Sequence, residues 1–173
     1  MEEKLLREYA RLIARIGGHV NKGDEVWINA GLDQPEFVYM VVEECYKAGA
    51  KFVDVKWDYE EMARLHYKYA TVGELSKVSP MALARLKYMV KKLPTMIHLI
   101  SDDPDGLKGV NQAKMAKTHM KRFPKIKKYR EAMDGKYKWC IAGVPGKAWA
   151  KKMFPELSEE EAMEKLWEAI LKT

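Results

Sequence analysis

The sequence contains little cysteine. Its 173 residues include two, Cys45 and Cys140, and no CxxC pair. Both lie inside apolar runs, VVEECYKAG and KWCIAGV, and this setting indicates buried free thiols rather than a disulfide framework. A reducing cytosol is therefore the natural compartment. The histidines lack the spacing of a zinc site, because they are scattered at His19, His66, His98 and His119.

Long hydrophobic runs are absent as well. The apolar stretches are far too short to span a bilayer. The first residues, MEEKLLREYARL, are charged and have helical periodicity, whereas a signal peptide has a basic start followed by a long apolar core. We therefore expect a cytoplasmic protein without a membrane partner.

Common motifs of binding and catalysis are missing too. The chain has neither GxGxxG nor the Walker motif GxxxxGK[ST], so a nucleotide held by backbone amides is disfavoured. It has neither HExxH nor GxSxG. No self-contained nucleophile or metal constellation remains, and the sequence assigns no catalytic, metal-binding or cofactor-binding residue to this chain.

The pattern that is present alternates short β-prone runs with amphipathic stretches. Strands are predicted at residues 25–31, 51–57, 95–101 and 136–144. Helices are predicted at residues 5–16, 37–49, 58–70, 80–92, 111–133, 148–154 and 158–171. The first strand-helix-strand unit spans about 33 residues, the size of a right-handed parallel crossover. We expect a single α/β domain over residues 1–173, with a mainly parallel sheet of about four or more strands and helices on both faces.

Acidic residues follow two of the predicted strands. Asp33 and Glu36 come after the first strand, where the carboxyl end of a parallel strand often opens a ligand crevice, but they are better interpreted as the start of the next helix. His98, within the third strand, is interpreted as a core residue rather than a sheet-edge group. The turn after that strand could hold a hard cation, yet it lacks the ligand spacing of an EF-hand, and we interpret it as an ordinary turn; its carboxylates are Asp102, Asp103 and Asp105.

The densest charge block is KMAKTHMKRFPKIKKYR, which has no acidic residue. Its basic residues are Lys114, Lys117, Lys121, Arg122, Lys125, Lys127, Lys128 and Arg130. This block could neutralise phosphates, with Phe123 and Tyr129 available for stacking, so a stand-alone module that binds nucleic acid or an acidic partner is the alternative function. An apolar residue at every third position, from Met120 to Tyr129, favours instead a face docked on the sheet with a solvated basic back. Nucleic acid is therefore the disfavoured partner.

Three segments together resemble the aminopeptidase T, aminopeptidase S and PepS family of metallopeptidases. The most specific is the closing one, WCIAGVPGKAWAKKMFPELSEEEAMEKLWEAI. The other two are LREYARLIARIGGHVNKGDEVWINAG at the amino terminus and DPDGLKGVNQAKMAK in the middle. The resemblance covers essentially all 173 residues.

This resemblance implies an enzyme domain without its active site. Family members are about twice this length or more, and they remove amino-terminal residues from peptides. They use two divalent metal ions, zinc, cobalt or similar, held by glutamate, histidine, tyrosine and aspartate side chains of the carboxy-terminal half, none of which maps onto this chain. The implied partners are that catalytic domain, a second copy in a homodimer and a peptide substrate. The isolated chain is expected to be inactive and to serve substrate access and domain packing.

A third hypothesis is a purely structural or dimerisation domain. It would place three aromatic residues at an exposed interface: Trp149, Phe154 and Trp167.

Overall fold

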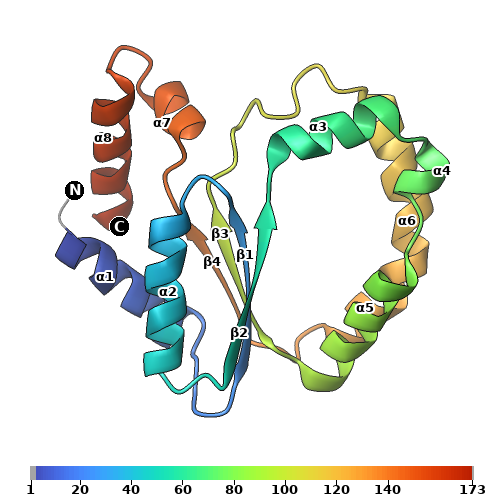
Figure 1. Cartoon of the computed structure of the whole chain (residues 1–173), viewed down its shortest axis with the longest axis horizontal. Coiled ribbons are helices and arrows are strands. Elements are labelled where there is room, and N and C mark those ends of the chain that lie inside the picture. Colours follow the sequence, from blue (N-terminus) through green and yellow to red (C-terminus); the bar gives the residue numbers. More distant parts are fainter. Residues whose placement is uncertain (1–2, 173) are drawn as a thin grey trace. The chain divides into compact units, whose positions relative to one another are not determined.

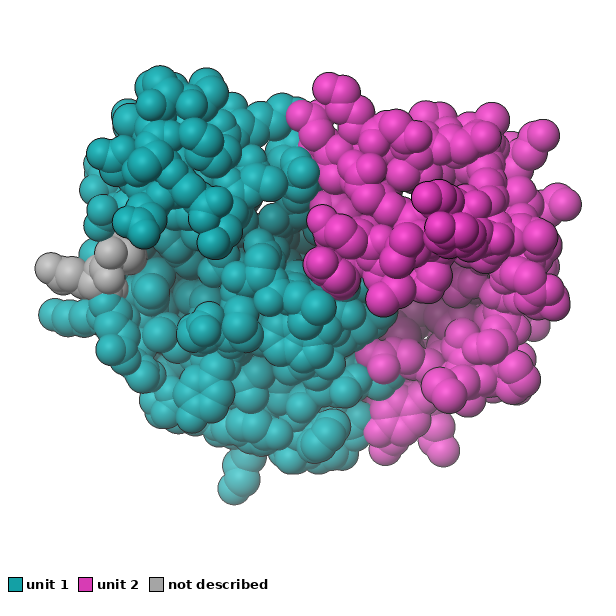
Figure 2. Space-filling model, turned by 45° about the horizontal axis from the view of Figure 1, so that its top comes forward, with its two compact units in different colours: residues 1–58, 94–104, 138–173 teal, residues 59–93, 105–137 magenta. Residues whose placement is uncertain are grey.

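The computed structural model describes residues 3–172, which form two compact units (Figure 2). Unit 1 consists of the described parts of Met1–Asp58, Pro94–Pro104 and Lys138–Thr173. Unit 2 consists of Tyr59–Leu93 and Asp105–Tyr137. None of the described helices combines the length and the apolar content needed to cross a membrane.

Unit 1 is built on a four-stranded sheet in the order β2-β1-β3-β4 (Figure 1). Its strands are β1 (Glu25–Gly31), β2 (Phe52–Asp58), β3 (Thr95–Ile100) and β4 (Trp139–Gly143). Every pairing is parallel, and Ile28 in the middle of β1 lies opposite Val55 of β2 and Ile97 of β3. The predicted α/β fold with a parallel sheet is confirmed.

One face of this sheet is apolar and covered by helices of unit 1. α1 (Glu3–Leu12) continues into a π-helical turn, η1 (Ile13–Gly17), and α2 (Pro35–Lys47) is the crossover between β1 and β2. Their side chains close a core with the inner face of the strands, in which the residues without solvent exposure include Ala14, Val26, Ile28, Val41 and Ile97. From β1 this core takes every second residue, Val26, Ile28 and Ala30, so these side chains mark the face that the helices cover, although Trp27 between them is buried as well.

The last two helices of the chain contribute buried side chains to unit 1. α7 (Lys147–Met153) and α8 (Glu159–Leu171) enclose a second small core that includes Ala150 and Ala162, against which Trp149 and Phe154 pack. Trp167 is 6% exposed, and its ring centroid lies 5.2 Å from that of Phe37. The hypothesis that these aromatics form an exposed interface is wrong for Trp167, because this ring fills the main core.

α8 begins with a reciprocal capping box formed by Ser158 and Glu161. The Ser158 hydroxyl accepts from the Glu161 amide at 3.2 Å, and the Glu161 carboxylate accepts from the Ser158 amide at 3.0 Å.

Unit 2 contains four helices: α3 (Glu60–Tyr69), α4 (Val72–Leu75), α5 (Pro80–Lys92) and α6 (Gln112–Met133). The sequence pattern predicts three of them and misses α4. Four residues are too few for a periodic pattern, and the signal that marks this helix is its cap, since the Thr71 hydroxyl accepts from the Glu74 amide at 3.2 Å.

α6 departs from its predicted packing. The helix runs through Pro124 without a break. Met120, which the spacing places on the docked face, is 72% exposed, whereas Phe123, Ile126 and Tyr129 are half-buried. Residues that are three positions apart do not stay on one face of a helix with 3.6 residues per turn. The row of apolar residues from Met120 to Tyr129 therefore moves around the helix and leaves the contact face.

Burial differs sharply between the units. Both hydrophobic cores consist of unit 1 residues. Among the described hydrophobic side chains of unit 2, Met133 alone is buried, while Tyr69 is 73% and Met81 is 82% exposed. Unit 1 therefore holds most of the hydrophobic stabilisation of this chain.

A matched pair of substitutions measures that difference in burial. Ile28→Ala removes a fully buried side chain from the central strand and should lower the free energy of unfolding by about 2–5 kcal/mol. Ile16→Ala makes the same change at a side chain that is 72% exposed and should shift it by no more than about 0.5 kcal/mol. Urea denaturation followed by circular dichroism measures both, and equal effects would contradict the assigned core.

Candidate functional site

The carboxyl ends of three strands meet at one edge of the sheet in unit 1. β2 lies on one side of β1 and β3 on the other, so the chain reverses its direction of winding between β1 and β3. In open parallel sheets such a reversal is the usual place for a ligand site. The segments that leave the strands there carry Asp33 after β1, Ser101 after β3, and Pro145 and Gly146 after β4.

Hydrogen bonds join these three strand ends. The Ser101 hydroxyl donates to Asp33 Oδ1 at 2.6 Å. The Gln34 side-chain amide donates to the carbonyl oxygen of Pro145. The sequence interpretation of Asp33 as part of the start of α2 is wrong, because the N-cap is Gln34, which makes no side-chain cap hydrogen bond. Glu36 does lie in the first turn of α2, as expected.

Two glycines allow the strand ends to approach this closely. A Cβ atom on Gly31 would lie 2.6 Å from Asp33 Oδ1 and from Ser101 Oγ. A Cβ atom on Gly146 would collide with the Ser101 carbonyl oxygen and lie 2.8 Å from Asp33 Oδ2. The Asp33 carboxylate, the Ser101 hydroxyl and backbone groups thus fill the space between the strand ends. They hold the strand ends together but do not form a general acid–base pair.

The other acidic candidates do not assemble into a metal site. Asp102 is exposed and Asp103 half-buried in the turn after β3, and Asp105 belongs to unit 2. Within residues 3–172 no group of three or more histidine, cysteine, aspartate or glutamate side chains is arranged to hold a metal ion.

His98 has a partner that the sequence did not reveal. It is half-buried on β3, and its Nδ1 lies 3.3 Å from the side-chain nitrogen of Asn29 on β1, within hydrogen-bonding distance. Burial, and then the nearby Lys56 charge, lower the pKa of His98. Asn29 was missed because only the register between β1 and β3 brings it opposite His98.

The two thiols are free, as expected. Cys45 is fully buried, and burial raises its pKa from 9.0 to about 12. Cys140 is half-buried against Gly17, and burial raises its pKa as well. Neither thiol has the electropositive, accessible setting of a reactive cysteine.

The basic block of α6 is only partly a solvated face. Lys117, Lys121 and Lys128 are exposed. Three of its side chains donate hydrogen bonds to backbone carbonyl oxygens within unit 2: the half-buried Lys114 to Tyr67 at 2.5 Å and Arg122 to Lys77 at 2.6 Å, and the exposed Lys125 to Ser76 at 2.9 Å. The prediction of a solvated basic back did not include these hydrogen bonds to the backbone of unit 2.

Both the fold and the three sequence segments quoted above agree with one family of known proteins. The sequence profile of the thermophilic metalloproteases (M29) matches residues 2–173. The chain belongs to the M29 family. The resemblance drawn from three sequence segments is therefore confirmed over nearly the whole chain.

Curated M29 relatives are longer than this chain. Aminopeptidase AmpS of Bacillus subtilis (strain 168) is 33% identical over 168 residues, which are 96% of this chain and 41% of the relative. Aminopeptidase PepS of Streptococcus thermophilus is 31% identical over 171 residues, which are 97% of this chain and 41% of the relative. The match is to the amino-terminal part of these relatives. The M29 chain thus spans about two fifths of their length.

A solved structure extends this agreement to the fold. Wild-type AmpT from Thermus thermophilus matches the M29 chain with a TM-score of 0.85 at 29% sequence identity. The match covers 98% of this chain and 43% of that structure.

The close packing at the strand ends predicts that a methyl group added at Gly146 destabilises the chain, whereas one added at Gly73 does not. Gly146→Ala should lower the free energy of unfolding by about 1–3 kcal/mol, because the new Cβ collides with backbone at Ser101. Gly73→Ala in α4 meets one atom, the Thr71 hydroxyl oxygen, at 3.5 Å, so this control should be neutral or stabilise by up to about 1 kcal/mol. Urea titrations test both, and tolerance of Gly146→Ala would show that the strand ends are not held together.

The burial of the thiols predicts slow labelling by a disulfide reagent such as DTNB at pH 8. A pKa near 12 makes the Cys45 thiolate about a thousandfold scarcer than at its ordinary pKa of 9.0. Cys140 should therefore react first, and both should react more slowly in the folded chain than in urea. Cys140→Ser assigns the signals. Labelling of Cys45 as fast in the folded as in the unfolded chain would contradict its burial.

Proposed function

We propose that this chain is the amino-terminal domain of a metal-dependent aminopeptidase that removes amino-terminal residues from peptides. The observation that carries the proposal is the match of almost the whole chain to the amino-terminal part of relatives named as aminopeptidases. The TM-score of 0.85 with AmpT adds that the backbone fold agrees with that of such a relative.

In this proposal the chain supplies structure rather than chemistry. Metal ions in metallopeptidases polarise the scissile carbonyl and activate water. On the family resemblance, we propose that two divalent ions, zinc, cobalt or similar, are held by a carboxy-terminal domain of the enzyme. Residues 3–172 offer no group of three or more histidine, cysteine, aspartate or glutamate side chains arranged to hold such an ion. In this proposal the carboxy-terminal domain packs against the parallel sheet, whose strand ends are joined by the hydrogen bond between Ser101 and Asp33.

Its proposed assembly is a homodimer in the cytoplasm. The free thiols Cys45 and Cys140 support a reducing compartment. In the dimer the amino-terminal domain restricts access to the active site, so that a peptide is selected by its end.

A chimera tests this division of labour. The purified chain alone should not hydrolyse a leucyl chromogenic substrate with cobalt or zinc, whereas full-length AmpT should. Replacing the matched amino-terminal 43% of AmpT with this chain should restore activity to a carboxy-terminal part that is inactive by itself.

The control is AmpT with that part deleted. Turnover proportional to the amount of the purified chain would place catalytic groups in it and contradict the proposal. A folded chimera that binds metal but stays inactive would also count against it.

A further inference from the structure

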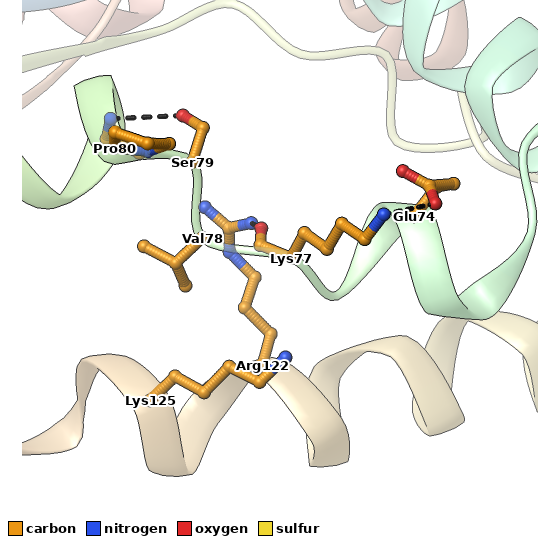
Figure 3. Close-up of a pocket in the computed structure, with 8 residues that line it drawn as sticks. Glu74, Lys77, Val78, Ser79, Pro80, Arg122 and Lys125 are labelled. Atoms are coloured by element: carbon orange, nitrogen blue, oxygen red, sulfur yellow. Dashed lines mark hydrogen bonds and ion pairs between the residues drawn. The ribbon is translucent and has the colours of Figure 1, made fainter.

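Unit 2 contains a hollow that the proposed function does not use. Its volume is about 620 Å³, and it lies between the segment after α4, the start of α5 and the middle of α6 (Figure 3). The residues that line it and matter to its chemistry are Glu74, Lys77, Ser79, Pro80, Arg122 and Lys125. All of them belong to unit 2.

The lining carries an excess of positive charge. Lys77 forms an ion pair with Glu74, which neutralises the carboxylate of the hollow. Arg122 and Lys125 have no carboxylate partner among residues 3–172, so two positive charges face this space without compensation. The start of α5, at Ser79 and Pro80, lines the same hollow and adds the positive end of a 13-residue helix.

The two cations are held in place before any ligand arrives. Arg122 reaches from α6 to the loop after α4 (Figure 3), where its Nη1 donates to the Lys77 carbonyl oxygen at 2.6 Å. Lys125 Nζ donates to the Ser76 carbonyl oxygen at 2.9 Å. These bonds join α6 to the segment that follows α4, and they use one of the five N–H donors of a guanidinium and one of the three of an ammonium group. The remaining donors are available to an anion.

We propose that this hollow binds the phosphoryl group of a small molecule through Arg122 and Lys125. A phosphate monoester carries about −1.5 to −2 charges at neutral pH, which matches the two unopposed cations. The planar guanidinium can donate two parallel hydrogen bonds to phosphate oxygens, and the ammonium group adds a point charge. The volume leaves space for the organic part of such a ligand. This site is independent of the aminopeptidase proposal.

Titration of the 173-residue chain with inorganic phosphate and with pyrophosphate tests the site, using amide chemical shifts at low ionic strength. Shifts should saturate and should be largest at the amides of Lys77, Ser79 and Ala82, around the hollow. Arg122→Gln and Lys125→Gln should each weaken binding about tenfold or more, because each removes a charge-assisted hydrogen bond. Arg122→Lys keeps the charge but loses the fork and should give an intermediate loss.

The matched control is Lys121→Gln, which removes the same charge from the neighbouring, exposed position of α6 outside the hollow. It should change the affinity less than twofold. Equal losses in Lys121→Gln and Arg122→Gln would reduce the effect to diffuse attraction by a basic helix and overturn the proposal. So would the absence of saturable shifts around the hollow, or binding of single-stranded DNA along α6 without any response to phosphate.

Discussion

The pairing of β1 with a parallel strand on each side is the constraint on which unit 1 depends. β1 forms backbone hydrogen bonds with β2 on one side and with β3 on the other. Its Val26 and Ile28 side chains are fully buried on the face that α1, η1 and α2 cover. Because β2 and β3 flank β1, the chain passes from β1 to β2 on one side and then crosses to β3 on the other side of β1. This reversal brings Asp33 and Ser101 to the same edge, so the position of the candidate site follows from the strand order.

The two units are stabilised by different interactions. Unit 1 has two hydrophobic cores, whereas the described part of unit 2 buries little apolar surface. Helix caps and hydrogen bonds from basic side chains to carbonyl oxygens take a larger share in unit 2, as at Arg122 and Lys125. A segment with few buried apolar contacts opens locally at a lower free energy than a packed sheet. The basic block of α6 is thus explained first by what holds its own helices together.

Much of the fold could be predicted from periodicity. The residues predicted for α5, 80–92, are those of the helix, and all four strands were found within a few residues of their bounds. These elements are long or strongly patterned, so local sequence is enough to identify them. α4 and the contact face of α6 were not predicted correctly, because a helix of four residues has no period and a stripe of three-residue spacing drifts around a long helix.

By itself, the sequence determined the alternation of strands and helices, the free thiols and, through three segments, the M29 family. The tertiary structure alone decided which side chains meet. Asp33 and Ser101 are 68 residues apart in the chain, and Asn29 and His98 are 69 apart. The physical reason is that local preferences set the shape of each segment, whereas the contacts between segments depend on strand order and register, which are fixed only when the whole sheet is formed.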